Sequence, residues 1–386
     1  MLNQWENNII ERLKEFSLTM VGTYEISSAA YGGALIKHQM GDFHHMVVEV
    51  SAKTLGNSLK AVIPSTQVKG IGVAVALGYI IGEVSKRWMI LDLFHKRDVL
   101  IAEEMILSHK IQVQESALLQ DYEIRFNVYD LDQNKTTMTI DMRQAFGHCE
   151  HIFEKPDTSN PWNEMDANER HLEEAISKIK QFVENADDET LKIADKFQRV
   201  NFKAAELGLQ ERTGIQLGAA LLKMGRQRRL QVDIPMKARV MVAAAVDNRM
   251  GGGGQPMMSL GVNGNESILL SVPIIAVGKD HNMTEIRMNK AVLFAIILYY
   301  YLKEQKESQY WGGHCGSHGG VSAAAAISWM LYGNHSQIAG ACKNMMTNAA
   351  LIQCQSYGES CIARLSMLGE EAVLAAYLAN EDIIFS

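Results

Sequence analysis

The sequence predicts an α+β protein, in which an N-terminal α/β part with a hairpin-containing sheet precedes a mostly helical C-terminal domain. Three observations favour this class. Helical and strand patterns alternate over residues 1–155, three amphipathic helical segments follow, and the rest of the chain is rich in Ala, Gly and Met with few charges. Because 386 residues exceed what one compact core usually holds, we expect two domains, 1–155 and 156–386.

The N-terminal part mixes two hydrophobic periods. Three segments have the apolar spacing or the small-residue content of helices: 9–16, 26–38 and 70–81. Two segments are rich in β-branched residues and predict strands: 45–51 and 59–64. Residues 122–141 alternate strongly around the turn formers Asp132-Gln133-Asn134-Lys135, which predicts a β-hairpin.

The segment 155–163 is the best candidate for a domain boundary, because it contains two prolines, several turn formers and little hydrophobicity. Amphipathic helices are predicted after it at 164–185, 188–207 and 213–224. The basic stretch 223–229 is expected to be the C-terminal end of a helix, where cations complement the helix dipole.

Charge and hydropathy limit the classes of partner. The formal net charge of −7 argues against a general nucleic-acid binder, which needs a clustered basic surface. Glutamates interrupt the apolar positions of the first twenty residues, unlike a secretory signal. The longest apolar run of the second half, 291–302, is too short to span a bilayer. We therefore expect a cytoplasmic protein without a membrane partner.

The five cysteines are unevenly placed. Cys149 stands alone, whereas Cys315, Cys342, Cys354 and Cys361 fall within the last quarter of the chain. Without an export signal this number does not favour disulfides. Cys342 lies in an apparent helix, where a cysteine is usually a small buried hydrophobe.

Cys315 stands in a glycine-rich loop, His314-Cys315-Gly316-Ser317-His318-Gly319-Gly320, ahead of a predicted helix at 321–331. Glycines beside a cysteine let backbone N–H groups and an inorganic core approach closely. Zinc is the rival metal at this loop, because His314 and His318 flank Cys315.

Cys354 and Cys361 are seven residues apart, so on one continuous helix they would stand about 10 Å apart along its axis. Gly358 and two serines lie between them, which allows the helix to break and bring the two thiols together. The spacing alone leaves open whether Cys315, Cys354 and Cys361 are metal ligands or ordinary buried residues.

Three features together carry a family resemblance: the segment Ala243–Gly252 (AAAVDNRMGG), the Gly264-Asn265 turn with Ile268 and Pro273 downstream, and the series Cys315, Cys354, Cys361. The chain resembles the iron–sulfur L-cysteine desulfidases and the α-type L-serine dehydratases along essentially its whole length. The resemblance implies a 4Fe-4S cluster held by Cys315, Cys354 and Cys361, with one iron left open for a ligand. It further implies a lyase that eliminates water or sulfide from a small amino or hydroxy/thio acid.

The resemblance also implies substrate contacts. Ser51 and Asn57 occupy the stretch that supplies polar contacts in the family, although Asn57 equally fits an ordinary turn residue. Arg249 can pair with a carboxylate through two hydrogen bonds, or form a salt bridge at a helix end. Asn265 fits a tight turn first and a substrate contact second.

The chain departs from the desulfidases at the position of their N-terminal cysteine. Where they have Gly-Cys-Thr-Glu-Pro, this chain has Gly22-Thr23-Tyr24-Glu25-Ile26, and the Thr23 hydroxyl is a far weaker acid than a thiol. Gly147-His148-Cys149-Glu150 offers a compensating acid–base pair, His148 with Cys149, unless Cys149 is a buried strand residue. Tyr24 and Glu25 are weaker candidates for the same role.

Three hypotheses follow from the sequence. The first is an active 4Fe-4S lyase with a shifted substrate or base, and the second is a family member that binds or senses a ligand without turnover. The third is a zinc hydrolase that uses His314, Cys315 and His318. The apolar helical part favours a homodimer.

Overall fold

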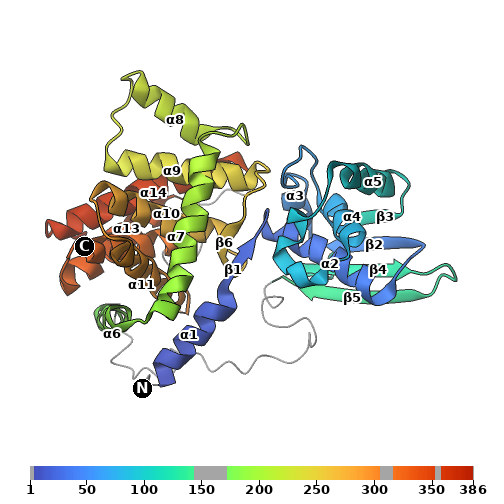
Figure 1. Cartoon of the computed structure of the whole chain (residues 1–386), viewed down its shortest axis with the longest axis horizontal. Coiled ribbons are helices and arrows are strands. Elements are labelled where there is room, and N and C mark those ends of the chain that lie inside the picture. Colours follow the sequence, from blue (N-terminus) through green and yellow to red (C-terminus); the bar gives the residue numbers. More distant parts are fainter. Residues whose placement is uncertain (1–3, 143–171, 305–315, 353–357, 386) are drawn as a thin grey trace.

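The structure, a computed structural model, describes residues 4–142, 172–304, 316–352 and 358–385. Figure 1 shows two lobes side by side, one built around a mixed sheet and one almost entirely helical. The predicted α+β class is confirmed. The described residues form two hydrophobic cores, one within each lobe. The expected domain boundary at residue 155 lies outside the described residues.

The sheet lobe, defined as residues 21–142, contains a four-stranded sheet of order β3-β2-β4-β5. Strands β2 and β3 are parallel, and the other neighbours are antiparallel. Its elements are α2 (Tyr24–Met40), β2 (His45–Val50), α3 (Ala52–Ser58), α4 (Ile71–Ile81), the 3-10 segment η1 (Val84–Asp92), α5 (Lys96–Leu107), β3 (Ile111–Glu115), β4 (Glu123–Tyr129) and β5 (Lys135–Asp141).

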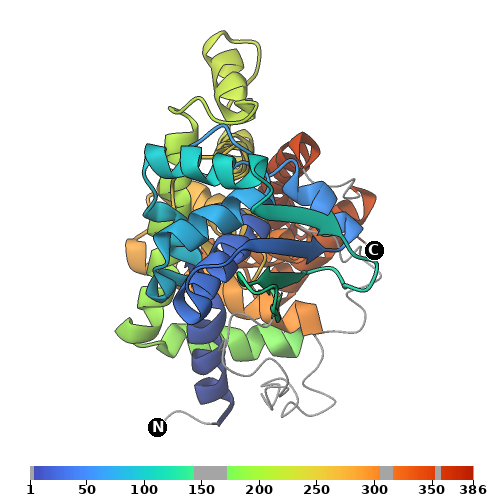
Figure 2. The same ribbon diagram turned by 90° about the vertical axis from the view of Figure 1, so that its right-hand side faces the viewer.

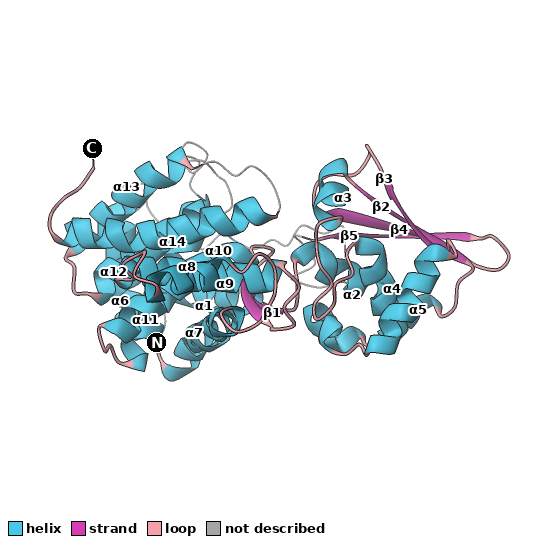
Figure 3. Cartoon of the chain, turned by 90° about the horizontal axis from the view of Figure 1, so that it is seen from above, coloured by secondary structure: helices cyan, strands magenta, loops and turns pink. Residues whose placement is uncertain are grey.

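One face of this sheet carries the lobe's core. Alternate residues of β2 are buried, and Val48 lies opposite Phe126 of β4 in the register. Helices α2, α4 and α5 lie on this side of the sheet (Figure 3). Gly32 of α2 lets the helix approach, since a Cβ there would lie 2.3 Å from the Phe126 ring. Helix α2 therefore packs directly on the sheet. The candidate residues 23–25 lie at the start of this helix.

Helices α2 and α4 cross at glycine positions. A Cβ at Gly33 would lie 2.1 Å from the Val75 carbonyl oxygen, and a Cβ at Gly78 would lie 1.7 Å from that of Ala30. Neither glycine has a positive φ, so the requirement is for space and not for an unusual backbone. The small residues of 70–81, which predict this helix, are explained by the close crossing.

The predicted strand at 59–64 is wrong. Leu59 ends α3, and the segment forms only an isolated antiparallel bridge between Val62 and Lys69. Both sides of β2 are already paired with β3 and β4, and Pro64 has no N–H to contribute to a ladder. The apolar residues of this segment fill the core of the lobe instead, as shown by fully buried Ala61 and Ile63. The predicted hairpin is confirmed as β4 and β5.

The helical lobe takes in the N-terminal helix as well as the C-terminal chain. Trp5, Ile9 and Leu13 of α1 belong to its core. Its elements are α1 (Gln4–Phe16), β1 (Ser17–Met20), α6 (Leu172–Asn185), α7 (Asp188–Gly208), α8 (Leu217–Arg226), α9 (Ile234–Met250), β6 (Met257–Leu260), α10 (Gly264–Asp280), α11 (Glu285–Glu304), α12 (Ser317–Met330), α13 (His335–Leu351) and α14 (Glu359–Asn380).

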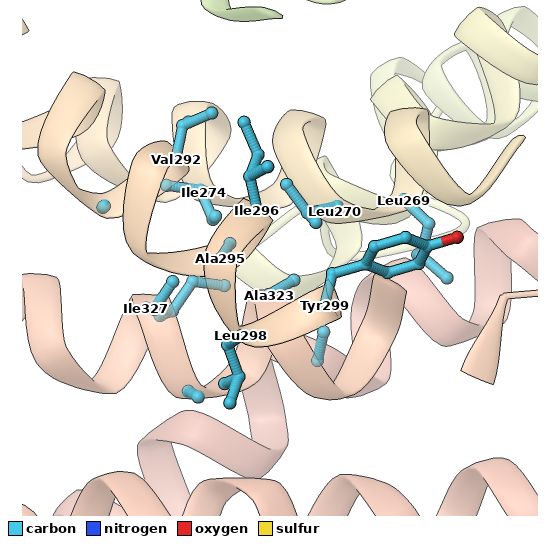
Figure 4. Close-up of a cluster of buried hydrophobic side chains, with 14 of the residues drawn as sticks. Leu269, Leu270, Ile274, Val292, Ala295, Ile296, Leu298, Tyr299, Ala323 and Ile327 are labelled. Carbon is cyan, nitrogen blue, oxygen red and sulfur yellow. The ribbon is translucent and has the colours of Figure 1, made fainter. Parts of the chain in front are cut away.

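Helices α10, α11 and α12 enclose the centre of this lobe. Figure 4 shows Ile274, Ala295 and Ile327 meeting there from the three helices, among other side chains that are almost all aliphatic. Buried alanines of α12 let the neighbouring helices pack closely, which explains the Ala-rich composition of the C-terminal part. None of the described helices combines the length and apolar character needed to cross a membrane.

Helix α8 begins four residues later than predicted. Gly214 and Gln216 both have positive φ, which excludes them from a helix. The Asp247 carboxylate of α9 accepts hydrogen bonds from the backbone N–H groups of Ile215 at 2.8 Å and Leu217 at 2.9 Å. Asp247 is therefore a structural residue that fixes the start of α8.

Described residues of the two lobes make contact where the chain leaves strand β1 and at the glycine loop after α9. Strand β1 pairs with β6 of the helical lobe, and the chain then enters the sheet lobe, where the Val21 N–H donates to the Trp88 carbonyl at 3.2 Å. The Ser65 N–H donates to the carbonyl of Gly252, in the glycine loop after α9, at 2.8 Å. Figure 2, turned by 90°, shows the sheet lobe in front of the helical lobe. These contacts bring the start of α2 close to the end of α9.

Candidate active site

Glu25 lies in the first turn of α2, at the junction of the two lobes. Thr23 is the N-cap residue with extended backbone, and its hydroxyl does not cap the helix. The Glu25 side chain is fully buried. Asn57, at the end of α3, donates to Glu25 Oε1 at 3.4 Å, whereas Oε2 is buried without a hydrogen-bond partner among the described residues. The structure therefore brings Thr23, Glu25 and Asn57 together.

Burial raises the pKa of the Glu25 carboxyl, because the charged form loses its solvation. The backbone N–H of Glu25, the polar groups of Thr23 and Tyr24, and the charge of Arg249 act in the opposite direction. A carboxyl group with a raised pKa and an oxygen that no described residue binds is suited to accept and return a proton.

Arg249 reaches the same junction from the last turn of α9, and only 4% of its surface is exposed. Its Nη1 donates to Asn265 Oδ1 at 3.0 Å, and its Nη2 lies 3.8 Å from the Met20 sulfur. Its Nε is buried without a hydrogen-bond partner in the described part of the chain. Gly264 makes room for the guanidinium, since a Cβ there would lie 2.6 Å from Nε. A buried guanidinium with spare donors is a suitable site for a carboxylate.

The first turn of α10 connects Arg249 with a second buried carboxyl, Glu266, which the sequence analysis missed. Asn265 contacts Arg249, and the next residue, Glu266, accepts a hydrogen bond from the Gly319 N–H of α12 at 2.7 Å. Burial raises the pKa of Glu266, while the Gly316 and Gly319 N–H groups and the charges of Lys303 and Arg364 oppose the rise. The only signal in the sequence was its place beside the Gly264-Asn265 turn.

Only one of the three cysteines expected to bind a cluster is among the described residues. Cys361 lies in the first turn of α14, with 8% of its surface exposed. Cys315 and Cys354 lie outside the described residues. Helix α13 ends at Leu351 and α14 begins at Glu359, so Cys354 and Cys361 do not share one continuous helix. Gly358, at which the sequence allows a helix break, lies directly before α14 with a φ of 119°.

The described neighbours of the three cysteines meet at Arg364. This residue is one helical turn beyond Cys361, and its Nε donates to the Ile352 carbonyl at 2.8 Å, two residues before Cys354. A Cβ at Gly316, the residue after Cys315, would lie 3.3 Å from Nη1 of Arg364. Gly316, Ile352 and Cys361, which lie next to or at the three cysteine positions, are therefore all close to Arg364.

Of the residues expected to bind zinc, His314, Cys315 and His318, only His318 is among the described residues. No group of three His, Cys, Asp or Glu side chains that could hold a metal occurs among them. His318 is buried in the first turn of α12, where desolvation and the charge of Lys303 lower its pKa to about 4. His314 lies outside the described residues. Cys342 is fully buried in α13, and burial raises the pKa of its thiol to about 12, as expected for an ordinary core residue.

The remaining candidate residues have other contacts. Ser51 is the N-cap of α3, where it accepts from the Thr54 N–H and donates to Asp121 Oδ1 at 2.8 Å. Tyr24 packs its ring against Tyr122, with the ring centroids 5.4 Å apart. His148 and Cys149 lie outside the described residues.

The geometry defines a two-lobed α+β protein with buried acidic and basic groups where the lobes meet. The family model described as "Serine dehydratase alpha chain" matches residues 86–384. The chain belongs to this family.

Curated relatives with similar sequences are each named "UPF0597 protein". The relative from Clostridium botulinum strain Loch Maree is 30% identical, and the relative from strain Okra is 29% identical. Each alignment covers 97% of this chain and 87% of the relative. The relative from Alkaliphilus oremlandii is 25% identical over 97% of this chain and 88% of its own length.

Proposed function

We propose that this protein is an iron–sulfur lyase that performs β-elimination on a small amino or hydroxy/thio acid, as part of amino acid catabolism. The observation that carries the proposal is the joint burial of Glu25 and Arg249 at the lobe junction. The carboxyl has an oxygen without a partner, and the guanidinium has a donor without one, among the described residues. Membership of the serine dehydratase alpha chain family supports this reaction class.

In this proposal Arg249 and Asn265 bind the substrate carboxylate. Arg249 offers Nε and further donors, and Asn265 holds the guanidinium in place through Nη1. Asn57 holds the Glu25 carboxylate on the other side of the junction. Ser51 acts less directly, because its hydroxyl fixes the start of the helix that carries Asn57.

Glu25 Oε2 removes the proton from the α-carbon. The electron pair of that bond forms the α,β double bond, and the leaving group departs with the pair of its bond to the β-carbon. From an amino acid the resulting enamine takes up water and releases ammonia and a 2-oxo acid. Thr23 and Tyr24 adjust the pKa of Glu25 in this scheme. His148 with Cys149 is the second proposed proton-transfer pair.

Cys315, Cys354 and Cys361 would hold a 4Fe-4S cluster, which supplies a Lewis acid for the departing hydroxide or thiolate. The convergence of Gly316, Ile352 and Cys361 around Arg364 supports this assignment. Glu266, one residue from Asn265, connects the substrate residues with the Cys315 segment. We further propose a cytoplasmic homodimer that acts on a small molecule, in line with the charge and cysteine content of the chain.

The second candidate function is a ligand-binding or sensing iron–sulfur protein without turnover. The threonine at position 23, where the desulfidases have a cysteine, favours it. Both candidates predict ligand binding at Arg249, and they differ only in product formation.

The test is an anaerobic reconstitution with iron and sulfide, followed by a screen of serine, cysteine, threonine and their hydroxy-acid homologues for 2-oxo acid. The lyase proposal predicts a coloured protein that forms a 2-oxo acid and loses activity in air. A coloured protein that binds an amino acid and forms no product supports the sensing function. Protein that stays colourless and contains zinc would refute both and favour the hydrolase hypothesis.

A further inference from the structure

Glu266 is hydrogen-bonded to the first turn of α12, which follows Cys315 in the sequence. Its Oε2 accepts from the Gly319 N–H at 2.7 Å, and the Gly316 N–H acts to lower the pKa of the same carboxyl. The fit leaves no spare room, because a Cβ at Gly319 would lie 2.6 Å from the Glu266 carbonyl oxygen and 2.7 Å from Oε2. The N–H groups at a helix start have no partners within the helix, so a carboxylate there fixes the direction in which the chain enters.

Arg364 makes contacts of the same kind near Cys354 and Cys361. It lies one turn after Cys361 in α14 and is buried. Its Nε donates to the carbonyl of Ile352, the C-cap residue directly after α13. Its Nη1 also lies beside Gly316, so one guanidinium touches the ends of α12 and α13 from within α14.

The two charges act on each other as well. The charge of Arg364 opposes the rise in the pKa of Glu266, and both side chains lie at the start of α12, Arg364 beside Gly316 and Glu266 at the Gly319 N–H. Burying both groups is costly unless each is well solvated by the protein. Glu266 is solvated by the Gly319 N–H and Arg364 by the Ile352 carbonyl. These two backbone groups lie near Cys315 and Cys354 in the sequence.

We propose that Glu266 and Arg364 are positioning residues that hold the three cysteine-bearing segments together before the cluster is assembled. The inference rests on the proposed function. It adds a frame, defined as the contacts of Glu266 with Gly319 and of Arg364 with Ile352 and Gly316. Because the frame is made of protein contacts only, it is expected to be present in the metal-free protein. It lowers the entropy cost of gathering three thiolates from separate segments.

The experiment compares E266Q and R364Q with wild-type protein after the same anaerobic reconstitution. Gln at position 266 keeps one acceptor but points a donor at backbone N–H groups, and Gln at position 364 removes the charge. The matched controls are E370Q and R239Q, since Arg239 Nη1 and Glu370 Oε2 form a half-buried ion pair between α9 and α14 at 2.8 Å.

The readouts are iron and sulfide per chain and the half-life of the visible absorption in the presence of an iron chelator. Circular dichroism and melting of the metal-free proteins report folding. We expect E266Q and R364Q to lose the cluster about 10- to 100-fold faster than wild type, as is typical when a contact behind a metal ligand is removed. The controls should retain it like wild type.

Two further variants keep the test decisive where a glutamine variant does not fold. R364K keeps the charge and one donor, so its cluster half-life should lie between those of wild type and R364Q. G319A places a Cβ 2.7 Å from Glu266 Oε2 and so disturbs this contact without removing a charge. It should shorten the half-life of the cluster. Wild-type cluster retention in folded Glu266 and Arg364 variants would overturn the inference alone, whereas wild-type protein that takes up no iron and sulfide overturns the proposed function with it.

Discussion

Arg249 Nη1 donates a hydrogen bond to Asn265 Oδ1 at 3.0 Å, which ties the last turn of α9 to the first turn of α10. The residue after Asn265 is Glu266, which holds the first turn of α12. One helical turn therefore connects the guanidinium at the lobe junction with the segment that follows Cys315. The proposed substrate residues and the proposed cluster segment belong to one continuous structure.

Replacement of Arg249 by lysine tests the carboxylate site. Lys keeps the positive charge but loses the fork of donors, so kcat/KM for 2-oxo acid formation should fall about 100-fold. The loss should appear mainly in KM, because the carboxylate is bound in both the substrate and the transition state. R239K, which alters the Arg239–Glu370 pair, serves as the control. An unchanged KM in R249K would show that the carboxylate binds elsewhere.

Replacement of Glu25 by glutamine tests the proton acceptor. Gln has nearly the same shape but cannot take the α-proton, so kcat should fall about 10²- to 10⁴-fold while the cluster content stays at the wild-type level. C149A provides the comparison, because Cys149 with His148 is the other proposed pair. If E25Q kept full activity and C149A lost it, Cys149 and not Glu25 would be the proton acceptor.

The same Glu25→Gln change should alter the pH dependence of stability. The folded-state pKa of Glu25 is raised above its ordinary value of 4.5, so the stability that its protonated form contributes is lost as the pH rises toward the folded-state pKa. Urea unfolding of the metal-free proteins from about pH 5 to about pH 8 should show E25Q gaining stability relative to wild type as the pH rises. A difference between the two proteins that stays constant with pH would contradict the burial of this carboxyl.

Glycine substitutions test the crossing of α2 and α4. Gly78→Ala would place a Cβ 1.7 Å from the Ala30 carbonyl oxygen, so the two helices would have to move apart. We expect a loss of about 2 kcal/mol or more in the free energy of unfolding. Gly56→Ala in α3 is the matched control, because its Cβ would meet nothing within 4 Å, and it should stabilise by up to about 1 kcal/mol. Equal effects at both positions would be inconsistent with the crossing.

The two described cysteines should differ in their effect on metal binding. C361A is expected to abolish retention of iron and sulfide after anaerobic reconstitution, since one of three ligands is removed. C342A should retain the cluster and lose only packing, because Cys342 is fully buried in α13. Iron content per chain and the visible spectrum measure both. Loss of the cluster in C342A and its retention in C361A would reverse the assignment.

Much of the fold could be predicted because it depends on local pattern. Helices α2, α4 and α7 and the β4–β5 hairpin follow the hydrophobic periods and turn residues of their own segments. The segment 59–64 could not be predicted correctly, since its β-branched residues fit a strand equally well. Only the pairing of β2 with β3 and β4 leaves it without a partner strand.

The sequence by itself determined the α+β class, because that class depends on local hydrophobic patterns, and it offered Glu25 and Arg249 as candidates through the family resemblance. The tertiary structure decided that Glu25, from the start of α2, and Arg249, from the end of α9, are both buried near the lobe junction. It also revealed Glu266 and Arg364, whose partners lie in other helices or at a helix end. A buried charge is identified by what surrounds it, and its surroundings come from parts of the chain that only folding brings together.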